Sequence, residues 1–174
     1  MPISGSLEGY FSDKVLDYGT AIRKVNDIKA ESKTVGLCHG AFDLLHPGHI
    51  RHLKSAKGLC DYLFVSITSD NFVNLSRGSS RPIIPDVLRA YSVANLGFVD
   101  YVVISDFEKG IEVIEALRPS YYIKGLDYIN KTEEENPALF EEIGRVVSVG
   151  GDIRYTLDEK LSTTEIIDYI KKSC

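Results

Sequence analysis

Residues Gly40 to Leu53 read GAFDLLHPGHIRHL and closely follow a short apolar segment, TVGLC. Three of the chain's four histidines, His46, His49 and His52, lie within this stretch. Pro47 suits the first turn of a helix, where a missing N–H has no intrahelical partner to lose. The stretch therefore predicts a strand that ends in a turn, followed by a helix with histidines at its start.

Apolar segments of strand length alternate with amphipathic segments of helical spacing along the rest of the chain. Ser12 is the expected N-cap of the first helix. Gly150 and Gly151 either turn a hairpin or end a helix before DIRYT, and we favour the helix end. The alternation predicts an α/β fold with a mainly parallel sheet covered on both faces. The predicted strands are TVGLC, DYLFVSIT, DYVVIS, YYIKG and DIRYT, and the main predicted helices cover 11–30, 47–59, 86–97, 110–118, 136–147 and 162–172.

The composition excludes several classes of protein. The formal net charge is −5, whereas binding of nucleic acid or of an anionic membrane surface requires a basic face. Cys38, Cys60 and Cys174 show no metal or redox spacing, which is typical of reduced thiols. No apolar run approaches the ~20 residues that span a bilayer, and the N-terminus lacks the pattern of a secretory signal. We expect a cytoplasmic protein with no nucleic-acid or membrane partner.

Parallel α/β sheets bind their ligands beyond the carboxyl ends of the strands. In this chain those positions are 40–49, 68–70, 105–106 and 124–127. They hold glycines, histidines, carboxylates and a lysine. The sequence therefore predicts a polar ligand site at this edge of the sheet.

The histidines admit three interpretations. As zinc ligands they are poorly placed, because helix positions six residues apart point in well-separated directions and no cysteine joins them. A structural role, in capping or packing, stays open for His39 and His52. His46 and His49 stand at a helix N-terminus, whose unpaired N–H groups and dipole favour a phosphate.

GAFDLLHPGHIRHL resembles the GxFDxxHxGH signature of the cytidylyltransferase-like nucleotidyltransferases. The segments SDNFVNLSRGSSRPIIPDVLRA, VDYVV, LRPSYYIKGLDY and LSTTEII follow in the order of that family. The likeness covers about residues 34–171 and is strongest to the nucleotidyltransferase domain of bacterial heptose-phosphate adenylyltransferases. Glycerol-3-phosphate cytidylyltransferase is a more distant likeness. The resemblance implies a Rossmann-like, three-layer fold of the HxGH type. It also implies transfer of a nucleotidyl group to a phosphorylated acceptor with release of pyrophosphate.

The resemblance also implies roles for individual residues. His46 and His49 would hold the nucleotide phosphates and stabilise charge around the α-phosphorus, and Arg77 and Lys124 join them as catalytic candidates. The other nucleotide-binding candidates are Gly40, Ala41, Phe42, Gly48, Gly125, Asp127, Ser162, Thr163 and Thr164, with Lys124 counted here as well. The candidates for binding the acceptor are Asp43, Asp70, Arg81 and Arg89.

Two of these assignments have plain structural alternatives. Arg89 could be an ordinary surface arginine on its helix. Ser162 to Glu165 form a complete capping box, which would explain the STTE sequence without any ligand. A capped helix N-terminus also presents N–H groups and hydroxyls to a phosphate, so both interpretations stay open.

The expected chemistry needs no catalytic serine or general base, because a phosphate or phosphonate acceptor is already ionised at neutral pH. Mg²⁺ is the expected cofactor, bound mainly through the nucleotide phosphates, with no dedicated protein site. Leu126 replaces the second glycine of the KGGD form found in adenylyl-transferring relatives. We expect its side chain to narrow the space beside the base, which favours CTP over ATP.

Two other functions remain as alternatives. One is an ATP-dependent adenylyltransferase of the heptose-phosphate type, and the other is a regulatory nucleotide-binding module without turnover. Residues 1–33 are expected to form a helical extension and 34–174 the nucleotidyltransferase domain. The resemblance further implies a homodimer.

Overall fold

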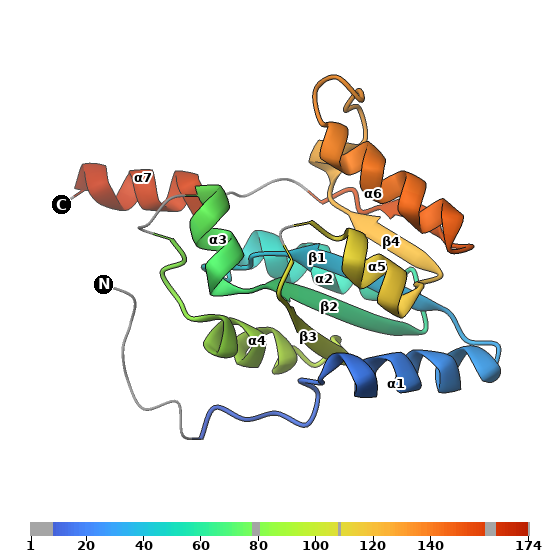
Figure 1. Cartoon of the computed structure of the whole chain (residues 1–174). Helices are drawn as coiled ribbons and strands as arrows, with labels where there is room; N and C mark the ends of the chain where they lie inside the picture. Colours follow the sequence, from blue (N-terminus) through green and yellow to red (C-terminus); the bar gives the residue numbers. More distant parts are fainter. Residues whose placement is uncertain (1–8, 78–80, 108, 159–162, 174) are drawn as a thin grey trace.

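A five-stranded, wholly parallel sheet forms the centre of the computed structural model, which describes residues 9–77, 81–107, 109–158 and 163–173 (Figure 1). The strand order is β3-β2-β1-β4-β5, and each adjacent pair is parallel. The predicted α/β, Rossmann-like fold is therefore confirmed. The strands are β1 (Val35–Gly40), β2 (Tyr62–Thr68), β3 (Tyr101–Ser105), β4 (Tyr121–Lys124) and β5 (Asp152–Tyr155).

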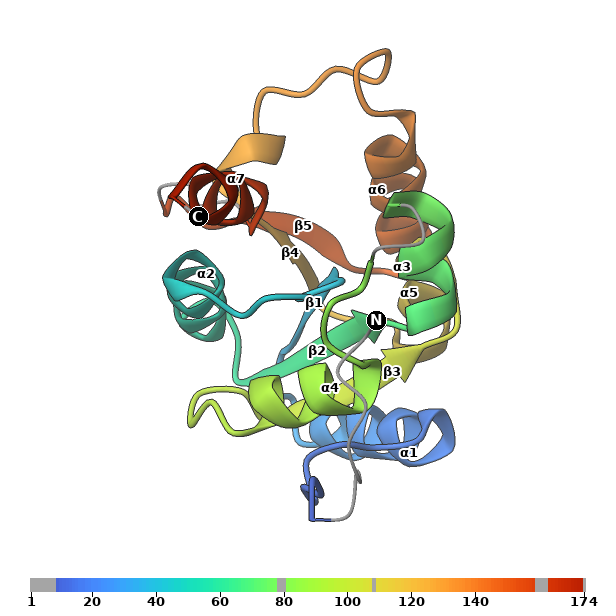
Figure 2. The same ribbon diagram turned by 90° about the vertical axis from the view of Figure 1, so that its left-hand side faces the viewer.

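Helices cover both faces of this sheet (Figure 2). One apolar core joins α2 and α4 to the first face, and a second core joins α1, α5 and α6 to the other. None of the helices in the described ranges is long and apolar enough to cross a bilayer. The helices are α1 (Tyr18–Ala30), α2 (Pro47–Lys57), α3 (Asp70–Arg77), α4 (Asp86–Ala94), α5 (Ile111–Leu117), α6 (Pro137–Ser148) and α7 (Thr163–Ser173), with a 3₁₀ turn, η1 (Leu126–Tyr128).

The two glycines after α6 end the helix and do not form a hairpin. Gly150 has φ +85°, which a residue with a side chain rarely adopts. A Cβ on Gly151 would collide with the carbonyl oxygen of Pro119. The chain then enters β5 parallel to β4, so the favoured interpretation of this segment is confirmed.

The first helix begins later than its sequence pattern predicted. Residues 14–16 run along the edge of β3, where Leu16 N–H donates to Val102 O and Val102 N–H donates to Lys14 O, each at 2.8 Å. This backbone pairing prevents a helix there. Asp17, and not Ser12, is the N-cap of α1 and accepts the backbone N–H of Thr20 at 2.9 Å.

Candidate functional site

His46 begins α2 at the carboxyl edge of the sheet and is 5% exposed. Its Nδ1 accepts the backbone N–H of His49 at 3.4 Å, so the proton of the neutral ring is on Nε2. Burial lowers the pKa of His46, which favours this neutral form. Nε2 is buried and has no hydrogen-bond partner among the described residues. It is therefore a buried donor that a ligand can satisfy.

The loop before α2 packs against the histidines. The His46 and His49 rings stack with their centroids 3.8 Å apart, and the Phe42 ring lies 5.2 Å from that of His49. Phe42 has φ +48°, an uncommon conformation for a bulky side chain. A Cβ on Gly40 would lie 3.2 Å from the Phe42 ring, so a larger residue there would displace it. In the first turn of α2, Pro47 has no N–H, while His49 and Ile50 donate theirs to His46, which leaves the N–H of Gly48 for a ligand. This arrangement fits the predicted phosphate site.

Asp43 is only 2% exposed and holds a neighbouring segment in place. One of its oxygens accepts the N–H groups of Ile83 and Ile84 at 2.7 and 3.1 Å. The other lies 2.6 Å from a guanidinium nitrogen of Arg81. Because both oxygens are engaged and buried, we correct the expectation that Asp43 binds the acceptor and assign it to fixing residues 81–84. Arg81 remains a candidate for the acceptor, oriented by Asp43.

Arg89 is neither a surface arginine nor placed to contact an acceptor, because its side chain is 0% exposed. Its guanidinium donates to Ile84 O at 2.8 Å, to the carbonyl oxygen of Ala41, and to Asp70 Oδ1 at 2.7 Å. These partners come from the histidine loop, the start of α3 and the chain before α4. Arg89 therefore holds these three segments together through buried hydrogen bonds and does not reach the surface of the site. The Asp70 side chain is 40% exposed and stays a candidate for the acceptor.

Lys124 ends β4 and lies in a buried ion pair. Its Nζ is 2.7 Å from Oε2 of Glu142 on α6, and Oε1 of Glu142 accepts the N–H of Gly110 at 2.8 Å. Nζ also lies 4.7 and 5.1 Å from the ring centroids of Tyr122 and Tyr128. Glu142 compensates the charge of Lys124 and fixes where its ammonium group lies.

Sequence reasoning missed Glu142. Burial alone would raise the pKa of its carboxyl, but the charge and hydrogen bond of Lys124 and the N–H of Gly110 outweigh burial and lower that pKa. A signal was present in the sequence. Leu139, Glu142 and Val146 form the buried stripe of α6, and a carboxylate in such a stripe requires a partner.

The turn after Lys124 is exposed on the surface of the molecule. Gly125 precedes η1, and Asp127 within it is exposed. Leu126 is 42% exposed. Its side chain therefore does not narrow an enclosed pocket, which removes the physical basis for the expected preference for CTP.

The other two histidines pair with hydroxyl groups. His39 on β1 lies 3.1 Å from Ser66 Oγ, and His52 Nδ1 lies 2.7 Å from Thr156 Oγ1. His52 thus faces the end of β5, while His46 and His49 stack on each other. The described residues include no group of three His, Cys, Asp or Glu side chains able to hold a metal ion.

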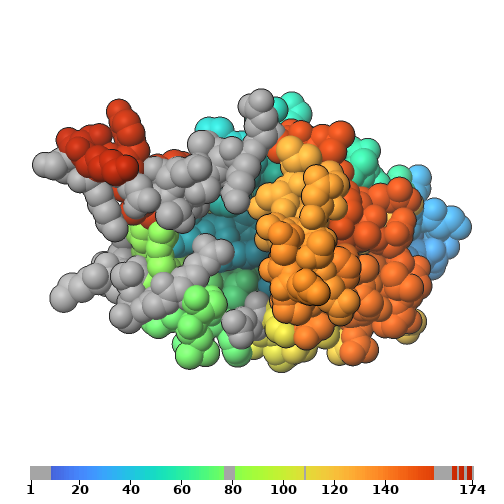
Figure 3. Space-filling view, turned by 90° about the horizontal axis from the view of Figure 1, so that it is seen from above, coloured from blue at the N-terminus to red at the C-terminus, as the bar shows by residue number. Residues whose placement is uncertain are grey.

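Some predicted site residues fall at the limits of the described chain. Ser162 lies outside it. Thr163 and Thr164 are the first residues of α7, and Arg77 is the last of α3, but their side chains are not described. In Figure 3 the surface of the β1–α2 region is visible between α3 and the chain that follows β4.

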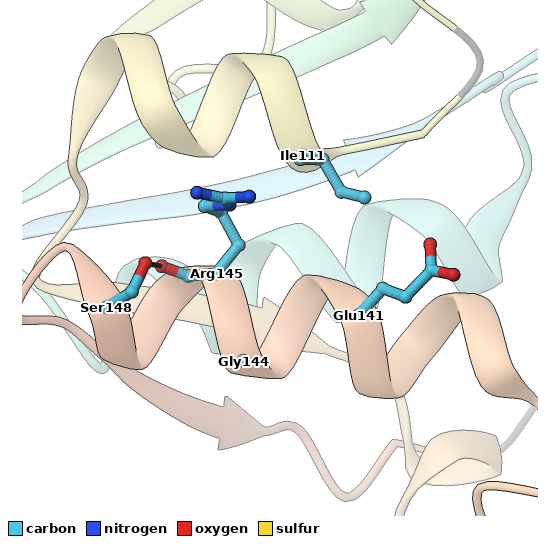
Figure 4. A pocket seen from close by; sticks show the side chains of 5 residues that line it. All are labelled: Ile111, Glu141, Gly144, Arg145 and Ser148. Atoms are coloured by element: carbon cyan, nitrogen blue, oxygen red, sulfur yellow. Dashed lines mark hydrogen bonds between the residues drawn. The ribbon is translucent and has the colours of Figure 1, made fainter.

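A separate pocket lies between α5 and α6, on the face of the sheet opposite to α2 (Figure 4). Its two charged lining residues are already paired with neighbours. Arg145 binds Glu115 at 2.7 Å, and Glu141 binds Lys109 at 2.5 Å. The Ser148 hydroxyl that lines the pocket donates to Arg145 O at 2.8 Å and has no neighbouring base among the lining residues, so the histidine site is the stronger candidate.

Residues 37–169 match the family model described as cytidylyltransferase-like. The chain belongs to the cytidylyltransferase-like family. It is similar to the bifunctional protein HldE of Helicobacter pylori strain G27, with 40% identity over 136 residues, covering 78% of this chain and 27% of the relative. Identity to HldE of Caulobacter vibrioides is 36% over 154 residues, covering 88% of this chain and 31% of the relative. The chain thus spans about 27–31% of the length of these relatives.

A solved structure has the same fold. A lipopolysaccharide core biosynthesis protein from Thermoplasma volcanium superposes with a TM-score of 0.58 at 23% identity, covering 75% of this chain and 99% of that one. Family membership and the HldE relatives confirm the predicted class, that of the nucleotidyltransferases. They do not support the expected preference for CTP over ATP.

Proposed function

We propose that this chain transfers an adenylyl group from ATP to the phosphate of a phosphorylated sugar of the heptose type and releases pyrophosphate. The observation that carries the proposal is the His46–His49 pair at the start of α2, with the buried, unpartnered Nε2 of His46. The resemblance to heptose-phosphate adenylyltransferases and the HldE relatives support the choice of substrates. The exposed position of Leu126 is compatible with a purine.

The reaction needs alignment and charge stabilisation more than acid–base chemistry. An ionised oxygen of the acceptor phosphate attacks the α-phosphorus of ATP. The bond from that phosphorus to the bridging oxygen of the β-phosphate breaks, and pyrophosphate leaves with the electron pair. His46 Nε2–H, His49 and the backbone N–H of Gly48 at the start of α2 would donate hydrogen bonds to phosphate oxygens as charge develops.

Mg²⁺ is part of the proposal as a cofactor held by the nucleotide. Asp43, the carboxylate in the histidine loop, is buried and already accepts from two N–H groups and Arg81. The phosphates of ATP would therefore supply most of the ligands. When bound, the ion neutralises charge on the leaving pyrophosphate. A homodimer and a cytoplasmic location remain predictions.

The proposal is tested by pyrophosphate release with ATP or CTP, with and without Mg²⁺, against sugar phosphates including heptose phosphates, polyol phosphates and phosphonates. We expect kcat/KM with ATP and a heptose phosphate to exceed that with CTP at least tenfold. A preference for CTP contradicts the nucleotide assignment. If the chain binds a nucleotide tightly but releases no pyrophosphate with any pair of nucleotide and acceptor, the regulatory nucleotide-binding module is favoured.

A further inference from the structure

His52 stands one turn after His49 on α2, and the proposed reaction gives it no role. Its Nδ1 lies 2.7 Å from Thr156 Oγ1. Burial lowers the pKa of His52, so the imidazole is neutral at pH 7 and suited to a hydrogen bond with a hydroxyl. The link joins residues far apart in the sequence.

Thr156 connects two parts of the site. It follows β5 directly and is 3% exposed. Its backbone N–H donates to the carbonyl oxygen of Lys124 at 2.9 Å, at the point where β4 leads into Gly125 to Asp127. Its hydroxyl binds His52, on the helix that begins with His46. One threonine therefore ties the middle of α2, the helix that His46 caps, to the loop expected to meet the base and ribose.

The contacts of α2 with the rest of the described residues differ from one side of the helix to the other. The helix packs mainly on β1 and β2 through Leu53 and Ala56. The neighbouring Arg51–Asp158 pair is 3.7 Å apart, and the Arg51 side chain is 59% exposed, so it contributes little. The His52–Thr156 hydrogen bond is a short, part-buried link from α2 toward β4 and β5.

We propose that the His52–Thr156 hydrogen bond is a positioning contact that sets the distance between the phosphate subsite at His46 and His49 and the base subsite at Gly125 to Asp127. This inference rests on the proposed function, because it takes ATP as the molecule that spans the two subsites. A ligand bound at two subsites gains affinity only when their separation matches its length. A ligand bound at one subsite is insensitive to that separation.

The test compares ATP with inorganic tripolyphosphate, both with Mg²⁺, by isothermal titration calorimetry on the full chain. Thr156→Val keeps the side-chain shape and removes the hydroxyl, whereas Thr156→Ser keeps the hydroxyl. Thr156→Val is expected to weaken ATP binding ~3–10-fold, the loss of about one hydrogen bond. Tripolyphosphate binding stays within about twofold. Thr156→Ser, and Lys54→Ala on the exposed face of α2, bind both ligands as the wild type does.

Steady-state kinetics and a second variant sharpen the test. The KM for ATP rises by the same factor in Thr156→Val, while kcat stays within about twofold. His52→Leu gives the same result. The double variant, His52→Leu with Thr156→Val, binds ATP no more weakly than either single variant, because both substitutions remove the same hydrogen bond. If Thr156→Val does not fold, His52→Leu and Thr156→Ser carry the comparison.

The outcomes separate this inference from the proposed function. Equal weakening of ATP and tripolyphosphate shows a general structural role and overturns the inference, as does unchanged ATP binding in both variants. A wild-type chain that binds neither ligand overturns the proposed function and the inference with it.

Discussion

The two ring nitrogens of His46 have different roles. Nδ1 caps α2 by accepting the N–H of His49, and this fixes the proton on Nε2, the atom left for a ligand. Burial lowers the pKa of His46, which favours this neutral form of the ring. An alanine variant would remove the cap and the donor together, so its loss of activity would not identify either role.

His46→Asn separates the two roles, because asparagine is also a favoured N-cap but has no atom at the position of Nε2. We expect pyrophosphate release to fall on the order of 10²–10³-fold, as when one preorganised donor is removed from a transition-state site. Thermal unfolding stays close to that of the wild type. His46→Ala loses the same activity and about 1 kcal/mol of stability in addition. Wild-type turnover in His46→Asn would contradict the role given to Nε2.

Among the elements, α6 contributes most to the site that sequence periodicity did not reveal. The pattern predicts the helix and its buried face correctly, but it does not show that a lysine at the end of β4 needs the Glu142 carboxylate. Lys124 and Glu142 are 18 residues apart in sequence and 2.7 Å apart in space. Only the parallel placement of β4 beneath α6 brings them together.

Glu142→Gln keeps the shape of the side chain and an oxygen for Gly110, but leaves Lys124 with an uncompensated buried charge. We expect a loss of about 2–4 kcal/mol in the free energy of unfolding at pH 7. Glu141→Gln on the same helix is the control, because its pair with Lys109 is about half exposed and should matter by less than ~0.5 kcal/mol.

The same variant has a characteristic pH dependence. The folded-state pKa of Glu142 lies below the ordinary value of a glutamate carboxyl, so its contribution is complete above that ordinary value and is lost as pH falls through the folded-state pKa. The difference in unfolding free energy between wild type and Glu142→Gln therefore shrinks toward zero in acid. Denaturant titrations between pH 3 and 8 measure it, and a pH-independent difference would show that the charge is not responsible.

On the scale of the whole molecule, the local sequence pattern predicts the strands well. It predicts poorly the hydrogen bonds of Arg89, which join segments of the site. All five predicted strands are present because buried parallel strands carry a strong apolar signal. The three partners of Arg89 come from separate segments that only the finished fold brings together. The late start of α1 also depends on a contact between distant parts of the sequence. Val102 forms backbone hydrogen bonds with residues 14–16, and these bonds prevent a helix there.

The described part of residues 1–33 shares the core of the rest of the molecule. Ala21, Val25 and Ile28 of α1 are buried in the cluster that includes Val103 of β3 and Val113 of α5. Residues 14–16 also extend the edge of β3. The expected domain boundary at residue 33 can therefore be tested by asking whether residues 34–174 fold without residues 1–33.

Removing residues 1–33 should abolish cooperative folding, because it uncovers the part of one sheet face that α1 covers beside α5 and α6. A point variant makes the same test without a truncation. Val25 is 2% exposed, so Val25→Asp buries an unpaired carboxylate and should cost about 3–5 kcal/mol, or roughly 10 °C in Tm. Asn26→Asp adds the same charge at the adjacent exposed position and should change Tm by no more than about 1–2 °C. Calorimetry of the three proteins with and without ATP–Mg²⁺ decides the matter. A truncated chain that unfolds cooperatively and is stabilised by the nucleotide would establish 34–174 as a domain that folds alone.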